Sequence, residues 1–239
     1  MVQICDRSST VTHRPQPSLS VIVNSNSDLR FRQFEVRFIQ RLALTDLQVI
    51  RIPDAVSMSE GYNRGAQMAD GEWLIFCHDD IGILDSNTGI CLEYAMRRSD
   101  LFGPCGTRRL VSGNWYDGGR PYTAGSVVAP DPARKGAYRL ELFGKSKRSL
   151  TTGIQALDGL FIACRRRVFD SIRGFDDTRL HGFHTYDIDF TFRAYLAGFR
   201  CAVANALVLL HDSNVSEFSE EKLNAWRRDQ EGFEQRVRA

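Results

Sequence analysis

The sequence predicts an α/β fold in which helices flank a largely buried sheet. Short apolar runs rich in β-formers, at 19–24, 47–52 and 72–77, alternate with segments of helical periodicity. This alternation favours a doubly wound sheet with right-handed crossover connections. At 239 residues, 43% of them hydrophobic, the chain is long enough to bury a substantial core.

Three helices are expected among these first strands. Phenylalanines recur at helical spacing over 30–44, which predicts an amphipathic helix. A second helix is expected from Ser59 to Asp70, with Gly71 as its stop signal. A third is expected over 88–98. The first 17 residues, rich in Ser, Thr, Pro and Gln, predict a flexible lead-in.

The second half of the chain is less regular. Gly, Pro and turn dipeptides crowd 103–150, which predicts hairpins and loops. A buried strand over 156–164 and a helix over 187–198, ended by Gly198, are expected next, then further strands within 200–211. The charged tail 216–239 is expected to be helical, with four candidate apolar contacts: Phe218, Leu223, Trp226 and Phe233. The expected division is a lead-in, one main domain and a helical tail, at 1–17, 18–214 and 215–239.

Composition excludes several classes of protein. A net charge of +2 is too mild to indicate nucleic acid as the main partner. No signal peptide and no apolar run of membrane-spanning length are visible, so a cytoplasmic location is expected. The six cysteines form no metal-type or redox-type pair, which favours buried, reduced thiols. P-loop, HExxH, GxSxG and dinucleotide fingerprints are all missing from the sequence.

Polar residues end two of the predicted strands. Asn24 ends the first, and His78, Asp79 and Asp80 follow the third. In doubly wound sheets, ligands bind beyond the carboxyl ends of the strands. Carboxylates placed there can hold a divalent cation together with diphosphate oxygens. A polar turn capped by Asp80 is an equally good interpretation of these residues alone.

Two further features are ambiguous by themselves. Asp187 at the start of a predicted helix is either an N-cap or a general base, and the cap is favoured. Asp189 and Arg193 are spaced for a surface ion pair. His211 closes an apolar strand, where a packed histidine is commoner than a metal ligand unless Asp80 lies nearby.

These features occur in an order that resembles the family 2 glycosyltransferases with the GT-A fold. The resemblance covers roughly Ser20 to His211 and is carried by five segments in order: SVIVNSNS, GYNRGAQMADGEWLIFCHDD, ALDGLFIACRRRVFDSIRGFDD, YDIDFTFRAYLAGFRCAV and LLHDS. The second contains the counterpart of the family's Asp-x-Asp metal motif. The fourth corresponds to its catalytic helix, and the fifth to its strand ending in a metal-binding His.

The resemblance implies a GT-A type, Rossmann-like mixed sheet flanked by helices, with a hairpin-rich acceptor region and a C-terminal helix. It implies a transferase that moves a sugar from a nucleotide diphosphate, most simply UDP, to a hydroxyl group. Mn²⁺ or Mg²⁺ would assist, and the anomeric carbon would be inverted. The acceptor could be a glycan, a lipid-linked oligosaccharide or a protein. Oligomeric state stays open.

The resemblance also assigns roles to individual residues. Asp80 would be the main metal ligand, His211 the second, and His78 occupies the first position of the metal motif. Asp187 would be the catalytic base, with Asp189 as the fallback. Donor-binding residues would be Asn24, Asp54, Asn63, Arg64, His78 and Asp79. Residues of the sugar and acceptor site would be Asp158, Gly159, Trp115, His184 and Tyr186.

Two positions depart from the family pattern. His78 stands where the family has Asp, and Tyr186 stands where it has Glu. These departures keep two other hypotheses open: a metal-dependent hydrolase or nucleotidyltransferase, and a nucleotide-sugar-binding protein with a degenerate site. Trp115 and Tyr116 are expected either to stack on an acceptor sugar or to form a small hairpin core. The basic segment 135–149 either closes over the diphosphate or is a solvated surface.

Overall fold

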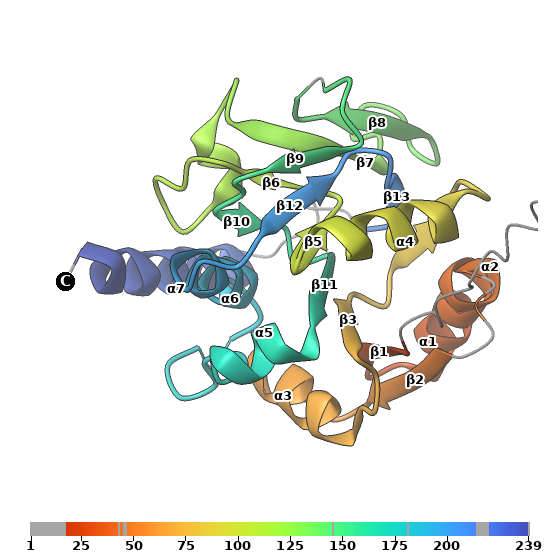
Figure 1. Ribbon diagram of the computed structural model, residues 1–239, viewed down its shortest axis with the longest axis horizontal. Coiled ribbons are helices and arrows are strands. Elements are labelled where there is room, and N and C mark those ends of the chain that lie inside the picture. The colour runs from red at the N-terminus through yellow and green to blue at the C-terminus, as the bar shows by residue number, and fades with distance from the viewer. Residues whose placement is uncertain are drawn as a thin grey trace, which may run out of the picture.

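Two mixed β-sheets form the framework of the part of the chain that the computed structural model describes (Figure 1). The described residues are 18–42, 44, 47–144, 146–180, 182–213 and 220–238. The expected lead-in 1–17 lies outside them. The α/β fold with helices flanking a mixed sheet is confirmed.

The larger sheet has seven strands in the order β2-β1-β3-β11-β5-β12-β9. β1 is parallel to both of its neighbours, whereas β11 is antiparallel to both β3 and β5. Val23 of β1 pairs with Cys77 of β3, so the two carboxyl ends meet at one edge. In sheet order the strands span Leu47–Ile52, Leu19–Asn24, Trp73–Cys77, Phe161–Arg165, Leu101–Gly103, Cys201–Ala204 and Leu150–Thr152.

Both faces of this sheet are covered, which explains its continuous apolar strands. On one face the strands pack against Phe34 and Phe38 and against Leu92. This face is covered by α1 (Asp28–Phe34), the π-helical turn η1 (Glu35–Ile39), α2 (Gln40–Leu42) and α4 (Thr88–Arg98). On the other face Tyr62, Val168 and Phe190 belong to α3 (Met58–Met68), α5 (Arg166–Ser171) and α6 (Tyr186–Leu196).

The smaller sheet has the order β10-β6-β7-β13-β4, with β8 paired to β7. Its strands, in sequence order, are β4 (Ile81–Ile83), β6 (Cys105–Thr107), β7 (Thr123–Pro130), β8 (Tyr138–Leu142), β10 (Ala156–Leu157) and β13 (Leu209–His211). A 3-10 turn, η2 (Trp115–Gly118), precedes β7. The antiparallel register sets His211 opposite Ile81. Residues that are about 130 positions apart in sequence therefore meet at the edge of β4.

Two expected element boundaries are wrong. α3 ends at Met68, because Ala69 has an extended conformation. Gly71 is not the helix stop. It packs closely against β1, where a Cβ atom would lie 2.6 Å from the Ser20 nitrogen. The expected strand over 156–164 is two strands, β10 and β11. The strand is interrupted at Asp158 and Gly159, so these two residues lie outside the regular strand pairing.

The C-terminal helix α7 (Glu220–Arg238) lies beside α6 (Figure 1). Phe233 is buried, with its ring 6.3 Å from that of Phe192, and Gly113 donates to the Glu234 carboxylate. Phe218 and the Leu223 side chain lie outside the described part of the chain. None of the described helices is long and apolar enough to cross a membrane. The five described cysteines are free thiols.

Candidate functional site

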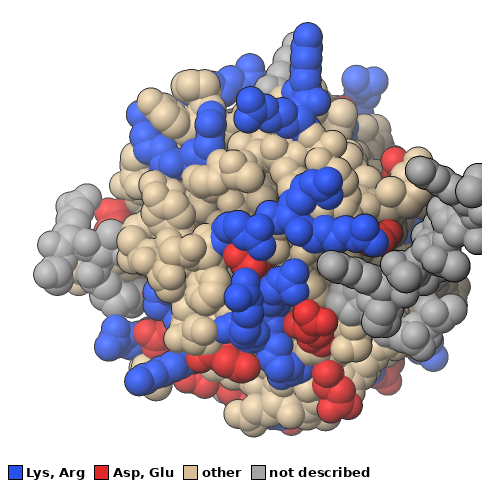
Figure 2. All heavy atoms as spheres, viewed as in Figure 1, with Lys and Arg blue, Asp and Glu red and all other residues tan. Residues whose placement is uncertain are grey.

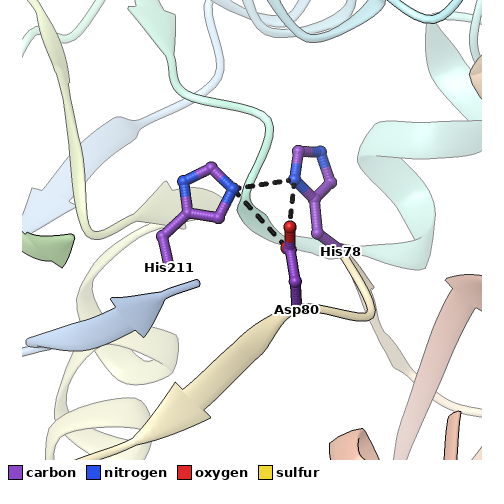
Figure 3. A group of neighbouring side chains, drawn as sticks. All are labelled: His78, Asp80 and His211. Atoms are coloured by element: carbon purple, nitrogen blue, oxygen red, sulfur yellow. Dashed lines mark hydrogen bonds and ion pairs between the residues drawn. The ribbon is translucent and has the colours of Figure 1, made fainter. Parts of the chain in front are cut away.

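Three potential metal ligands converge where β3 gives way to β4 (Figure 3). Nε2 of His211 lies 3.5 Å from Oδ1 of Asp80, and Nδ1 of His78 lies 3.9 Å from the same oxygen. The two imidazole nitrogens are 3.4 Å apart. Figure 3 shows the three side chains pointing toward one another from β13 and from the β3–β4 turn.

Local structure fixes this arrangement. The His78 amide donates to the Leu160 carbonyl, and the Asp212 amide donates to the Asp80 carbonyl. Asp212 is itself held by Arg37, whose guanidinium lies 2.7 Å from the carboxylate. Backbone hydrogen bonds beside the strand ends therefore hold this region in place.

The Asp80 carboxylate is incompletely satisfied. Its Oδ1 atom is buried and accepts no hydrogen bond from the described residues. A buried acceptor without a partner costs about 1–3 kcal/mol. Such a cost is tolerated where a ligand supplies the missing interaction. The orphaned oxygen therefore fits a site built for a cation.

The hydrogen bonds of His78 indicate its tautomer. The Tyr186 hydroxyl donates to the Gly159 carbonyl, 3.3 Å away, and lies 2.8 Å from Nε2 of His78. When this hydroxyl donates to Gly159, it accepts from Nε2 of His78, and Nδ1 is left with a free lone pair that faces Asp80. Burial lowers the pKa of His78, and the proximity of His211 adds to that effect, although Asp80 opposes it. A neutral imidazole with a free Nδ1 is a metal ligand.

The spacing also fits a metal ion. An ion with bonds of about 2.0–2.2 Å holds neighbouring ligand atoms about 3–3.6 Å apart. The observed separations of 3.4, 3.5 and 3.9 Å need little adjustment. Two imidazoles with one carboxylate suit a transition metal better than Mg²⁺, which prefers oxygen ligands.

A cavity of about 270 Å³ opens on one side of this centre. Asn24, His78, Asp79 and Asp80 line it. The family resemblance implies donor binding for the first three of these residues and metal binding for His78 and Asp80. Asp79 accepts a hydrogen bond from Ser25, at 2.7 Å. Oδ1 of Asn24 is buried without a hydrogen-bond partner among the described residues and is a second polar atom available to a ligand.

Three expected donor-binding residues lie outside the wall of this cavity. Asp54 is exposed and pairs with Arg64, which also pairs with Glu60. Asn63 exchanges hydrogen bonds with the backbone of Phe175 and so holds the segment that follows α5. These contacts occupy the side chains of Asn63 and Arg64 within the fold.

A larger cavity, of about 800 Å³, borders the same cluster at His211. Its wall includes His211, Asp158 and Trp115. Trp115 is buried and donates from its indole nitrogen to Asp158, at 2.9 Å, while its ring packs edge-on against Phe143. Trp115 thus belongs to a small core. Its neighbour Tyr116 packs edge-on against Trp115 and Phe143, is 58% exposed and lines the cavity.

Asp187 has an unusual environment at the start of α6. Burial raises its pKa to about 7, and the charge of Asp158 contributes, whereas hydrogen bonds from the backbone amides of Ile188, Asp187 itself and Gly159 oppose the rise. Gly159 packs tightly against this helix, since a Cβ atom would lie 2.3 Å from the Tyr186 hydroxyl and 3.0 Å from the Cβ of Asp187. Only glycine fits this contact. The close approach links the break after β10 to the first turn of α6.

Asp189, two residues further along, is different. Its buried carboxylate lies 2.7 Å from Nε of Arg193, and that guanidinium also donates to the carbonyls of Ile172 and Gly174. Thr185, which precedes the helix, has φ of 63° and a buried hydroxyl without a hydrogen-bond partner among the described residues. A β-branched residue in this region is strained, and such strain is frequent at functional sites. His184 lies in the same turn and is half-buried, but it lines neither cavity.

Comparison with known families identifies the chain. Residues 20–231 match the family model described as "Glycosyltransferase like family". The protein belongs to this family. The match covers both strands that end at the His78, Asp80 and His211 cluster and the helix that carries Asp187. No curated protein matches this glycosyltransferase in sequence.

Solved structures share its fold. The mannosyltransferase PcManGT from Pyrobaculum calidifontis, in complex with GDP-Man and Mn²⁺, superposes with a TM-score of 0.58 at 14% identity, over 94% of this chain and 65% of that one. GalNAc-T7 with UDP, GalNAc and Mn²⁺ gives 0.55 at 12%, over 89% and 47%. S. aureus TarS gives 0.50 at 12%, over 82% and 60%. The glycosyltransferase therefore spans about half to two thirds of these chains.

Some residues of the site are not evident from the sequence. Ser25, Met58 and Phe183 line the smaller cavity, and Leu160 and Phe143 line the larger one. Ser25 follows Asn24 directly and could have been found by extending the strand-end argument by one residue. The others are apolar side chains that carry no chemical signal in sequence.

Proposed function

We propose that this glycosyltransferase moves a sugar from a nucleotide diphosphate to a hydroxyl acceptor with the help of a divalent cation. The observation that carries the proposal is the position of His78, Asp80 and His211 at the junction of two cavities. A transferase must hold two substrates on either side of one reacting centre. The smaller cavity would take the nucleotide and the larger one the acceptor.

The metal would be held by Asp80, His211 and His78. When bound, it would stabilise the negative charge that develops on the departing diphosphate. The donor set favours Mn²⁺ over Mg²⁺, because two of its three atoms are imidazole nitrogens. Asn24 and Asp79 would contact the nucleoside from the wall of the smaller cavity, with UDP as the proposed nucleotide. Asp54, Asn63 and Arg64 would not contact the donor directly, because they lie outside the wall of the smaller cavity.

Asp187 would be the general base. A carboxyl group whose pKa is about 7 accepts a proton efficiently near neutral pH. Asp187 would take the proton from the acceptor hydroxyl as that oxygen attacks the anomeric carbon, and the bond to the diphosphate would break on the opposite face. This single displacement inverts the anomeric carbon. Asp189 is a weaker candidate because Arg193 already pairs with it.

Asp158 and Gly159 would shape the sugar and acceptor site. Asp158 is held by Trp115 and by the Leu160 amide, at 2.9 Å each, so its position is rigid. Tyr116 has the exposed ring that an apolar sugar face would stack on. A glycan, a lipid-linked oligosaccharide or a protein side chain could supply the accepting hydroxyl.

Thermal unfolding with UDP, GDP and dTDP, with and without Mn²⁺ or Mg²⁺, tests the proposal. A ligand that binds only the folded state raises the melting temperature. We expect a rise with UDP that needs Mn²⁺ and is lost in Asp80→Ala. No rise with any nucleotide would refute the transferase proposal and favour a degenerate site. Rapid hydrolysis of the nucleotide sugar without an acceptor would favour a hydrolase.

A further inference from the structure

A third cavity, of about 490 Å³, lies at the end of the molecule that holds β6, β7 and β9. It is bordered by the start of β7 and by part of the segment between β8 and β9. None of its lining residues lines either cavity at the metal centre. Three arginines stand around it: Arg108, Arg120 and Arg148.

These arginines have no acidic partner among the described residues. Arg108 donates to the carbonyl of Pro121 and Arg120 to that of Leu142, both at 3.1 Å. A carbonyl fixes the position of a guanidinium without neutralising it. No carboxylate in the described part of the chain pairs with any of the three, and the side chain of Arg148 makes no described hydrogen bond.

Several arginines elsewhere in the molecule pair with carboxylates. Arg165, Arg167 and Arg200 converge on Asp100, and Arg193 pairs with Asp189. The net charge of the whole chain is only +2, so three unpaired arginines around one cavity are a local concentration of positive charge. Figure 2 shows a group of basic side chains over this end of the molecule, at the top of the view.

We propose that this cavity binds an oxyanion, the phosphate or carboxylate group of an acidic glycan. Guanidinium groups form paired, charge-assisted hydrogen bonds with both kinds of anion. Consecutive residues connect this cavity with the 800 Å³ cavity: Leu142 and Phe143 line the 800 Å³ cavity, and Gly144 lines the arginine-bordered cavity. An acidic chain bound here would lie beside the acceptor side of the enzyme. Binding of the anion itself does not depend on the metal centre.

Backbone amide signals of ¹⁵N-labelled protein, titrated at low ionic strength, test this proposal. The probes are inorganic phosphate and sodium glucuronate, with glucose as the neutral control. We expect at least one anion to shift the signals of Thr123, Gly144 and Thr151, while glucose leaves them unchanged. The anion that binds identifies the source as phosphate or carboxylate.

Substitutions make the test specific. The triple variant Arg108→Gln, Arg120→Gln and Arg148→Gln should weaken binding at least about tenfold, since each guanidinium supplies a charge-assisted bond. Arg148→Gln alone should weaken it at least about threefold without disturbing the fold, because this side chain has no described partner. The matched control removes three exposed arginines elsewhere: Arg32→Gln, Arg98→Gln and Arg228→Gln. Equal binding by both triple variants, or no shift with either anion, would overturn the proposal.

Discussion

Two aspartates next to strands of the larger sheet, Asp80 after β3 and Asp100 before β5, have opposite environments. Asp100 accepts hydrogen bonds from Arg167 at 2.6 Å and from Arg200 at 3.0 Å. Burial alone would raise its pKa, but these arginine hydrogen bonds outweigh burial and hold the pKa of Asp100 well below its usual range. Figure 2 shows basic and acidic side chains gathered in the middle of the view, in the region of β5 and β12.

Asp80, by contrast, faces two imidazoles and has one buried oxygen without a hydrogen-bond donor among the described residues. The difference separates a carboxylate that is satisfied within the fold from one that we propose to bind a cation. The same contrast recurs within α6, where Arg193 satisfies Asp189 while the pKa of Asp187 is raised to about 7. Incomplete pairing, rather than burial or residue type, marks the proposed functional carboxylates.

The largest effect is expected from Asp80→Ala. Transfer activity should fall at least about 1,000-fold, because the cation loses its only carboxylate among the three proposed ligands. The melting temperature without metal should stay the same or rise, since the substitution removes an unsatisfied buried acceptor. Activity assays with Mn²⁺ and metal-free thermal unfolding measure the two effects. Retained activity would remove Asp80 from the metal centre.

Asp187→Asn comes next. The amide cannot accept the proton, so kcat should fall about 100- to 10,000-fold while the fold survives. Asp189→Asn is the matched control on the same helix, and it should lower the melting temperature more than the activity of the folded enzyme. The opposite pattern would make Asp189 the base.

The pH profile sharpens the same assignment. Below pH 7 the rate should fall about tenfold per unit, because protonated Asp187 is not a base. The pKa of Asp187 is higher in the folded protein than its ordinary 3.8, so the stability it contributes at low pH is lost as the pH rises through about 7. Asp187→Asn should abolish both trends, and a flat acid limb in the wild-type enzyme would exclude Asp187.

Asp100→Ala should lower stability and spare activity, whereas Asp80→Ala should lower activity and spare stability. Three arginines lose their shared acceptor, and the free energy of unfolding should fall by about 2–4 kcal/mol. The activity of the molecules that remain folded should change little. Urea unfolding together with activity per folded molecule checks this. A loss of activity per folded molecule in Asp100→Ala would show that Asp100 is not purely a structural carboxylate.

The smallest effect is expected from Tyr186→Phe. This change removes the hydroxyl that lies 2.8 Å from Nε2 of His78 and fixes its tautomer. Loss of such a supporting hydrogen bond typically weakens metal affinity about 10- to 100-fold. Titration with Mn²⁺ should show the weaker affinity, and activity should recover at high Mn²⁺. A loss of activity that excess Mn²⁺ does not restore would favour a direct acceptor-binding role for Tyr186.

The sequence by itself determined the alternation of strands and helices and the family. Apolar periodicity is local, so the strands at 19–24 and 47–52 and the helix over 88–98 are found where expected. The convergence of His78 and Asp80 with His211 was foreseen only through the family resemblance, because no local pattern joins residues about 130 positions apart. The antiparallel pairing of β4 with β13 brings them together.

Only the tertiary structure decided which polar side chains are free to act. Asn63 and Arg64 lie in the segment that resembles the family, yet the fold engages them with Phe175 and Glu60. The departures at His78 and Tyr186 look unrelated in sequence, but they form one hydrogen-bonded pair in space. A sequence states which groups can bind a ligand or donate a hydrogen bond. Whether such a group is still free for a ligand depends on the neighbours that the folded chain places around it.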